Sequence, residues 1–263
     1  MCHHSVVMMS IGIATISRNA GPFLEKAVES VLSSNYQNLR YVVQDCNSTD
    51  GSTAFVHSIQ DPRLIFQAEH DFGPADGLNR AFGALVDCDV VGWLNSDDLL
   101  LPGSIDFIAK QFADEPELMV LQGAGVIIDE RGTVVGHYSP RRYSPRLARL
   151  RVTSMFQPSL YLRNFVIEYP PFNPKNRSCW DSELLYSVAS RGCKVRRAQR
   201  PLAAFRLHPS SISGSGRLTE VYREEEAGFL GDPPIPTPLT RGLSAVMWLE
   251  ARLSSLAHTQ HVS

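Results

Sequence analysis

The segment Asn95-Ser96-Asp97-Asp98 carries oxygen-bearing side chains directly after a short apolar run at residues 90–94. The run has the β-branched and aromatic composition of a buried strand. In α/β sheets, ligands bind at the carboxyl ends of strands, and carboxylate oxygens suit Mg²⁺ or Mn²⁺ held together with substrate phosphates. The segment therefore indicates a metal and phosphate site, although an Asp-rich turn that caps the next helix would have the same composition.

Two other aspartates occupy equivalent places along the chain. Asp45 follows an expected strand at residues 39–43, and Asp76 lies in the loop region after an expected strand at residues 64–66. Because the carboxyl ends of parallel strands meet at the same edge of a sheet, we expect Asp45, Asp76 and Asp97 to share one rim. A solvated charged edge would explain each residue separately, but the repetition favours a shared site.

Alternating strand and helix patterns predict the sheet that would position this rim. In the first half, apolar strand-like runs alternate with segments of helical spacing, which implies βαβ units and a largely parallel sheet. The second half adds a hairpin with a Gly-containing turn and an Arg-rich segment. We expect strands at residues 6–16, 39–43, 64–66, 90–94, 118–121, 126–128, 133–135, 193–197 and 202–207, and helices at 22–32, 52–59, 78–85, 102–112, 180–190, 217–230 and 243–256.

Composition places the chain among globular α/β proteins. Its 263 residues are 43% hydrophobic and 20% charged, which suits either one large α/β domain or a domain with an appendage. The net charge of −2 gives no sign of nucleic-acid binding. The five cysteines are scattered and never spaced as CxxC, which favours free thiols over disulfides or a zinc site. With no leader and no membrane span in the sequence, we expect a cytoplasmic protein whose membrane contact is peripheral, at the inner face.

Seven fragments follow one another along the chain: IGIAT at residues 11–15, LEKAVESVLSSNYQNLRYVVQDCNSTDGS at 24–52, GPADGLNRAFGAL at 73–85, VGWLNSDDLLLPGS at 91–104, FQPSLYLR at 156–163, WDSELL at 180–185 and FRLHPSSIS at 205–213. Together, in this order and spacing, they resemble the family 2 glycosyltransferases, which are inverting enzymes of the GT-A fold. The resemblance covers about residues 6–215.

The resemblance implies an α/β fold of the GT-A type, with a mostly parallel Rossmann-like sheet flanked by helices. Residues 1–215 would form the glycosyltransferase domain, with the nucleotide-sugar-binding half at 6–104 and the acceptor and catalytic half at 105–215. Residues 216–263 would form a small C-terminal helical extension. The implied reaction moves a sugar from a nucleotide sugar to a hydroxyl of a glycan, a lipid-linked acceptor or a polysaccharide precursor, with inversion and with Mn²⁺ or Mg²⁺. A UDP-sugar is the first expectation for the donor, ahead of GDP- and dTDP-sugars.

Four residues match the family's nucleotide-binding positions. Asp45 resembles the aspartate that hydrogen-bonds the base, beside main-chain contacts from the turn at Thr15. Gly73 and Asp76 fall where the family lines the base and ribose pocket.

The metal and catalytic positions are matched with one departure. Asp97 corresponds to the metal-binding aspartate of the family's DxD element, and His208 to a histidine that completes the metal site in several members. Asn95 replaces the first DxD aspartate; it can hydrogen-bond ribose but adds no charge, so Asp98 would compensate as a metal ligand. Asp181 occupies the position of the catalytic base. From spacing alone, a helix-capping Asp181 and a packed His208 would be the simpler interpretations; the resemblance favours the functional ones.

The expected chemistry of Asp181 follows from its place at the start of a helix. The helix dipole would favour its charged form, and its pKa would stay near the ordinary value of about 4. Glu183 would point elsewhere on the helix and would not substitute for it.

A second departure from the family pattern is DCNSTDG at residues 45–51, where the family has DGGSTDG. Asn47 tolerates a positive φ better than most residues, so the departure leaves the base preference open without removing a catalytic group.

Two other functions fit parts of the pattern. A sugar-phosphate nucleotidyltransferase also places acidic residues and Mg²⁺ at such a rim, but residues 17–21 make a poor version of its Gly-rich phosphate loop. A degenerate carbohydrate-binding protein would explain Asn95.

Five arginines lie between Arg141 and Arg151. Together with the C-terminal amphipathic helix, they could hold an anionic lipid or a pyrophosphate-bearing acceptor near a membrane surface. A solvated arm is the alternative.

Overall fold

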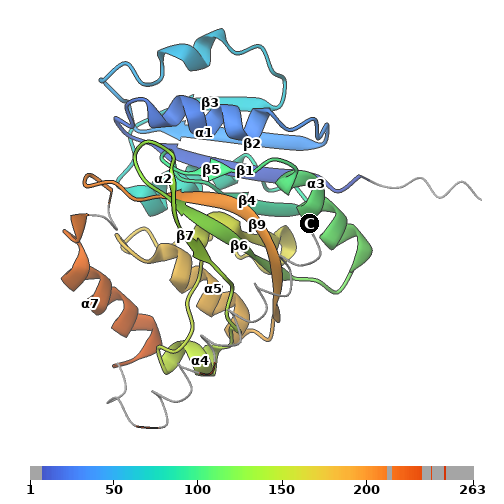
Figure 1. Cartoon of the computed structure of the whole chain (residues 1–263), viewed down its shortest axis with the longest axis vertical. Helices are drawn as coiled ribbons and strands as arrows, with labels where there is room; N and C mark the ends of the chain where they lie inside the picture. Colours follow the sequence, from blue (N-terminus) through green and yellow to red (C-terminus); the bar gives the residue numbers. More distant parts are fainter. Residues whose placement is uncertain (1–7, 212–214, 233–237, 239–245, 247–263) are drawn as a thin grey trace, which may run out of the picture.

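One nine-stranded sheet with helices packed on both faces organises the chain (Figure 1). The computed structural model describes residues 8–211, 215–232, 238 and 246. The strand order is β3-β2-β1-β4-β8-β6-β9-β5, with β7 paired to β6 off this path. Within the described residues, no helix is long and apolar enough to cross a membrane.

The first four strands are parallel, and their carboxyl ends lie on the same side of the sheet. They are β1 (Ile11–Ser17), β2 (Leu39–Asp45), β3 (Leu64–Ala68) and β4 (Val90–Trp93). Ser17 pairs with Asp45 and Asp45 pairs with Ala68, so β1, β2 and β3 end together, whereas Trp93 pairs with Ala14 and β4 ends slightly earlier. The rim expected from the sequence is therefore present.

Each face of this sheet is covered by two helices whose apolar residues follow helical spacing. In α1 (Phe23–Leu32) the buried residues are Leu24, Ala27, Val28 and Val31, and they share a core with α3 (Ser104–Asp114). On the opposite face, α2 (Pro74–Gly83) and α5 (Trp180–Ser190) form a second core with alternate residues of the same strands. A short 3₁₀ helix, Ala54–Ser58, links β2 to β3.

The second half of the sheet mixes directions. Strand β8 (Leu160–Arg163) runs antiparallel to both β4 and β6 (Val120–Ile128), and β9 (Val195–Arg206) runs parallel to β6. The short β5 (Leu99–Leu100) pairs with β9, and β7 (Val134–Tyr138) forms the expected hairpin with β6. Two short helices, α4 (Pro145–Arg149) and Gln157–Ser159, and a 3₁₀ turn at Asn164–Val166 precede α5, and α7 (Thr219–Leu230) packs beside α5.

The prediction from the sequence divided two long strands incorrectly and missed two short ones. Residues 193–197 and 202–207 belong to the single strand β9, because the intervening residues form a bulge: Gly123 pairs with Ala198 but Ala124 pairs with Pro201. Likewise β6 joins the strands expected at 118–121 and 126–128. Strands β5 and β8 were not predicted, and the first strand starts at Ile11 rather than at residue 6. The helix expected at 243–256 lies, apart from residue 246, outside the described residues.

Candidate active site

At the end of β2, the carboxylate of Asp45 is held by its own loop. One oxygen accepts a hydrogen bond from the Ser48 amide at 2.7 Å and the other from the Ser48 hydroxyl at 2.6 Å. Asn47 takes a left-handed conformation with φ 49°, so the residue that replaces a family glycine supplies the required turn. Cys46 is buried, with its sulfur 3.7 Å from the Asp71 carbonyl oxygen. The two residues that replace the family's glycines, Cys46 and Asn47, are thus both accommodated in the folded loop.

The other donor-site candidates lie at the same rim, with their side chains engaged inside the protein. The hydroxyl of Thr15 is buried and accepts a 2.9 Å hydrogen bond from Tyr41, so only the main chain near Thr15 is available to a nucleotide. Asp76 accepts hydrogen bonds from the Phe72 amide and from Arg80, both at 3.1 Å. These bonds fix the loop that begins α2.

Two features of this loop bear on the donor site. Gly73 has φ 132°, a conformation that favours glycine, and its amide donates to the Asp71 carboxylate at 3.0 Å. The ring of Phe72 is 82% exposed beside it. An exposed aromatic ring at the rim where the donor is expected is a candidate surface for a base, and nothing in the sequence apart from its position marks Phe72 for this role.

Asp97 and His208 face each other across the rim, although 111 positions separate them. The distance from His208 Nε2 to Asp97 Oδ2 is 2.9 Å, and the other ring nitrogen is 2.8 Å from the Ser210 hydroxyl. The Asp97 side chain is 24% exposed and that of His208 only 8%. The structure therefore brings together a carboxylate oxygen and an imidazole nitrogen from the two residues for which the sequence predicts a metal-binding role.

Asp98 is placed differently from the expected metal ligand. Its side chain is fully buried, and one carboxylate oxygen accepts a 2.8 Å hydrogen bond from the Arg206 amide on β9. Burial, and then the charge of Asp97, raise the pKa of this carboxyl well above its usual range. The Asp98 side chain thus ties the rim loop to β9, instead of being exposed at the rim beside Asp97.

Arg206 is a site residue that sequence reasoning missed. Although only 1% exposed, it donates from Nε to the Asp97 carbonyl oxygen at 2.8 Å and from Nη1 to the Asp129 carbonyl oxygen at 3.0 Å. Its guanidinium carbon lies 4.9 Å from the centre of the Phe23 ring. A buried cation beside Asp97 and Asp98 offsets part of their negative charge and fixes the loop that carries them.

Asn95 and Gln157 connect this rim to the catalytic half. The Asn95 amide donates to Gln157 Oε1 at 3.0 Å, and the Gln157 amide donates to the Trp93 carbonyl oxygen at 2.7 Å. Gln157 also lines the large pocket in which Asp181 lies. The two halves of the candidate site therefore meet at Gln157.

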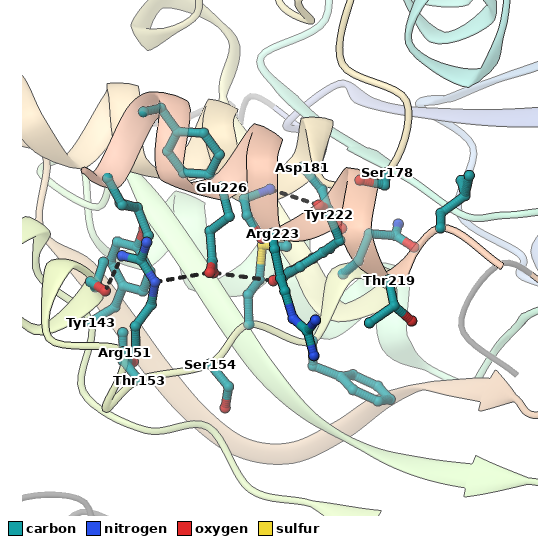
Figure 2. A pocket seen from close by; sticks show the side chains of 18 of the residues that line it. Tyr143, Arg151, Thr153, Ser154, Ser178, Asp181, Thr219, Tyr222, Arg223 and Glu226 are labelled. Carbon is teal, nitrogen blue, oxygen red and sulfur yellow. Dashed lines mark hydrogen bonds and ion pairs between the residues drawn. The ribbon is translucent and has the colours of Figure 1, made fainter. Parts of the chain in front are cut away.

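Asp181 projects from the first turn of α5 into a pocket of about 940 Å³ (Figure 2). The wall opposite comes from α7, which contributes Tyr222, Arg223 and Glu226, and from the segment before β8, which contributes Tyr143 and other residues. Figure 2 shows these side chains converging on the same space.

Burial raises the pKa of Asp181 to about 6, although hydrogen bonds from the Ser182 amide and from its own amide lower it. The expectation of a pKa near 4 was therefore wrong, because desolvation outweighs the favourable helix terminus. Glu183 points elsewhere, as expected: its carboxylate accepts hydrogen bonds from Asn173 at 3.1 Å and from Asn176 at 2.8 Å.

The family model for glycosyl transferase family 2 matches residues 11–167, which is more than half of the chain. The chain belongs to glycosyl transferase family 2. This membership decides against the nucleotidyltransferase alternative.

Relatives and solved structures agree with the family and with the GT-A fold. The Escherichia coli protein "UDP-Glc:alpha-D-GlcNAc-diphosphoundecaprenol beta-1,3-glucosyltransferase WfaP" is 22% identical over 220 residues, which cover 82% of this chain and 84% of that protein. TarS 1–349 of S. aureus in complex with UDP-GlcNAc is similar with a TM-score of 0.66 at 16% identity, over 91% of this chain and 72% of that one. The mannosyltransferase PcManGT of Pyrobaculum calidifontis, in complex with GDP-Man and Mn²⁺, has a TM-score of 0.59 at 17% identity, over 97% and 76%.

Proposed function

We propose that this family 2 glycosyltransferase moves a sugar from a nucleoside-diphosphate sugar to a hydroxyl of a lipid-linked or free glycan, with inversion at the anomeric carbon. The observation that carries the proposal is the arrangement of two chemically different centres joined by Gln157. Asp97 and His208 lie 2.9 Å apart at the strand rim and would bind a cation, and Asp181 places a partly buried carboxylate in the adjoining pocket. Transfer between two substrates needs such a divided site.

The donor would lie along the rim of β1 to β4. The main chain near Thr15, the loop of Asp45, and the segment carrying Gly73 and Asp76 would hold the nucleoside, and Asn95 would face the ribose. A UDP-sugar is the first candidate, because TarS is solved with UDP-GlcNAc and the E. coli relative uses UDP-Glc by name; PcManGT, solved with GDP-Man, keeps a GDP-sugar as the alternative.

Asp97 and His208 fit a divalent cation, because a carboxylate oxygen and an imidazole nitrogen are directed at each other within 2.9 Å. Among the residues that the structure describes, no group of three His, Cys, Asp or Glu side chains forms a complete metal site. A cation here would therefore take its other ligands from the donor diphosphate and water, as Mg²⁺ and Mn²⁺ commonly do. When bound, it would neutralise charge that develops on the leaving diphosphate.

Asp181 would act as the general base. A carboxylate with a pKa near 6 is ionised at neutral pH and accepts a proton more readily than one with an ordinary pKa. It would take the proton of the acceptor hydroxyl as that oxygen attacks the anomeric carbon from the face opposite the diphosphate, which inverts the configuration. The pocket of about 940 Å³ is large enough for a sugar ring of the acceptor.

A donor and acceptor panel tests the proposal. UDP-Glc, UDP-GlcNAc and GDP-Man are each incubated with Mn²⁺ and with GlcNAc-diphospho-undecaprenol as acceptor, and the product is identified by mass spectrometry and its anomeric configuration by NMR. We expect one donor to give a product with inverted configuration. Asp181→Asn should lower transfer ~10²–10⁴-fold, whereas Glu183→Gln on the same turn should not. Donor binding without turnover in every combination would favour the non-catalytic carbohydrate-binding alternative, and a retained configuration would rule out this mechanism.

A further inference from the structure

Glu225, on the inner side of α7, is bound to the segment that leads into α5. Its carboxylate accepts hydrogen bonds from the Arg177 amide at 2.7 Å, from the Ser178 amide at 3.0 Å and from the Ser178 hydroxyl. Three bonds from adjacent groups hold one carboxylate, so this contact fixes both the position and the orientation of residues 177–178 relative to α7.

The start of α5 is also supported by the Asn176 side chain, which donates a 2.8 Å hydrogen bond to Glu183 in the first turn. Its capping residue, Cys179, makes no side-chain capping bond, and the Asn176 side chain accepts hydrogen bonds from the Cys179 amide at 2.9 Å and from the Ser178 amide at 3.2 Å. Glu225 adds a negative charge at the positive end of the helix. Asp181 lies only three residues beyond Ser178, in the first turn.

Helix α7 is also bound to Arg151, in another part of the pocket wall. Glu226 forms a 2.8 Å ion pair with Arg151 and accepts a hydrogen bond from Tyr222 at 3.3 Å (Figure 2). Both side chains of the ion pair are about one-fifth exposed, so solvent screens them only in part. Adjacent glutamates of α7 thus bind two different parts of the pocket. Glu226 binds Arg151 in the pocket wall, and Glu225 binds residues 177–178, which lead into the helix that carries Asp181.

We propose that Glu225 is a positioning residue for Asp181, so that α7 belongs to the catalytic apparatus. The inference rests on the role proposed above for Asp181. Glu225 touches neither substrate; it acts by holding residues 177–178 and hence the first turn of α5. A shift of about 1 Å in a reacting group can cost ~10²-fold in rate, so loss of this anchor should reduce turnover more than binding.

The test compares Glu225→Ala, Glu225→Gln and Glu225→Asp with Glu224→Gln, a matched control on an exposed position of the same helix. Hydrolysis of UDP-GlcNAc, or of the donor selected by the panel, is followed over pH 5–8, donor binding is measured by calorimetry and folding by thermal melting. We expect Glu225→Ala to lower kcat ~10–100-fold with little change in donor Kd, Glu225→Gln to retain part of the rate through its remaining acceptor oxygen, and Glu224→Gln to match the wild type.

The pH profile separates positioning from a merely structural effect. If the first turn of α5 loosens, Asp181 becomes more solvated and the acid limb of kcat should move to lower pH in Glu225→Ala. The charged and titratable groups facing Asp181 across the pocket are Arg151, Arg223 and Glu226, with Tyr143 and Tyr222, and none of them is altered in these variants.

Ser178→Ala keeps the test informative if Glu225→Ala does not fold. It removes the hydroxyl donor, and its effect on kcat should be non-additive with that of Glu225→Gln. Wild-type kcat and pH profile in Glu225→Gln and Ser178→Ala, or an equal loss in Glu224→Gln, would overturn the proposal. If instead Asp181→Asn retains full activity, the assignment of the base fails, and that outcome does not depend on Glu225.

Discussion

At the scale of single residues, the decisive balance in the site is between burial and hydrogen bonding at Asp181. The carboxylate accepts a 2.7 Å hydrogen bond from the Ser182 amide at a helix N-terminus, which by itself would lower its pKa. Partial enclosure by α7 and the segment before β8 limits the access of water to Asp181 and raises its pKa to about 6. A pKa of about 6 suits the general-base role proposed for this residue.

This balance predicts opposite effects of Asp181→Asn on activity and on stability. The activity of the wild type should rise with pH through about 6, as Asp181 loses its proton, and the variant should lack this limb. In the folded state the pKa lies above that of the unfolded chain, so the folded protein binds the extra proton between about pH 4 and pH 6, and stability falls as pH rises through this window.

The change in unfolding free energy caused by Asp181→Asn can be estimated from the shifted pKa. Two pKa units correspond to about 3 kcal/mol, but the pocket is open to solvent, so we expect Asp181→Asn to stabilise the fold at pH 7.5 by about 1–2 kcal/mol and to have little effect near pH 4. Denaturant unfolding at both pH values measures it. An equal loss of stability at both would show that the carboxylate is a structural cap and not a strained base.

At the scale of elements, the long strand β9 explains why the adjacent residues Asp97 and Asp98 have different environments. Asp97 faces His208, just beyond the end of β9, whereas Asp98 turns inward and binds the amide of Arg206 on that strand. The loop after β4 is therefore fastened to β9 from within and leaves only Asp97 at the surface of the rim.

The matched pair Asp97→Asn and Asp98→Ala should separate the two roles. Asp97→Asn removes the charged ligand at the surface, so we expect it to abolish activation by Mn²⁺ with little loss of stability. Asp98→Ala leaves the buried Arg206 amide without an acceptor, so it should cost about 1–3 kcal/mol in unfolding free energy. Manganese titration of activity and chemical denaturation give the two readings. If Asp98→Ala were as stable as the wild type and lost its metal dependence, Asp98 would be a ligand after all.

What the sequence could and could not predict also differs by element. The rim was predictable, because local strand patterns place Asp45 and Asp97 at strand ends and parallel pairing brings those ends together. The burial of Asp98 was not predictable, because it depends on Arg206, which lies 108 positions away. Arg206 belongs to β9, which a bulge made look like two separate strands in the sequence. The contact between Glu225 and Ser178 likewise joins residues 47 positions apart on a helix that reads only as a charged surface.

At the scale of the whole molecule, a nearly neutral chain concentrates positive charge in one arm, residues 141–151. The structure uses part of that charge internally: Arg149 donates to the Tyr186 hydroxyl at 2.7 Å, and Arg151 pairs with Glu226 at 2.8 Å. Arg146 and Arg149 also line a smaller pocket of about 520 Å³ with Pro145 and Leu150. The arm thus borders the wall of the pocket that contains Asp181.

We therefore predict weak, salt-dependent binding to anionic membranes through Arg141 and Arg146. Each basic side chain near an anionic surface contributes about 1 kcal/mol, so Arg141→Ser with Arg146→Ser should weaken co-sedimentation with phosphatidylglycerol-containing vesicles roughly tenfold or more. Lys110→Ser with Arg131→Ser removes the same charge from α3 and from the turn between β6 and β7, and should leave binding unchanged. Raising the ionic strength should abolish the difference, because the attraction is screened within about a Debye length. Equal and negligible sedimentation with anionic and neutral vesicles would show that the arm is a solvated surface and that the acceptor is recognised without the membrane.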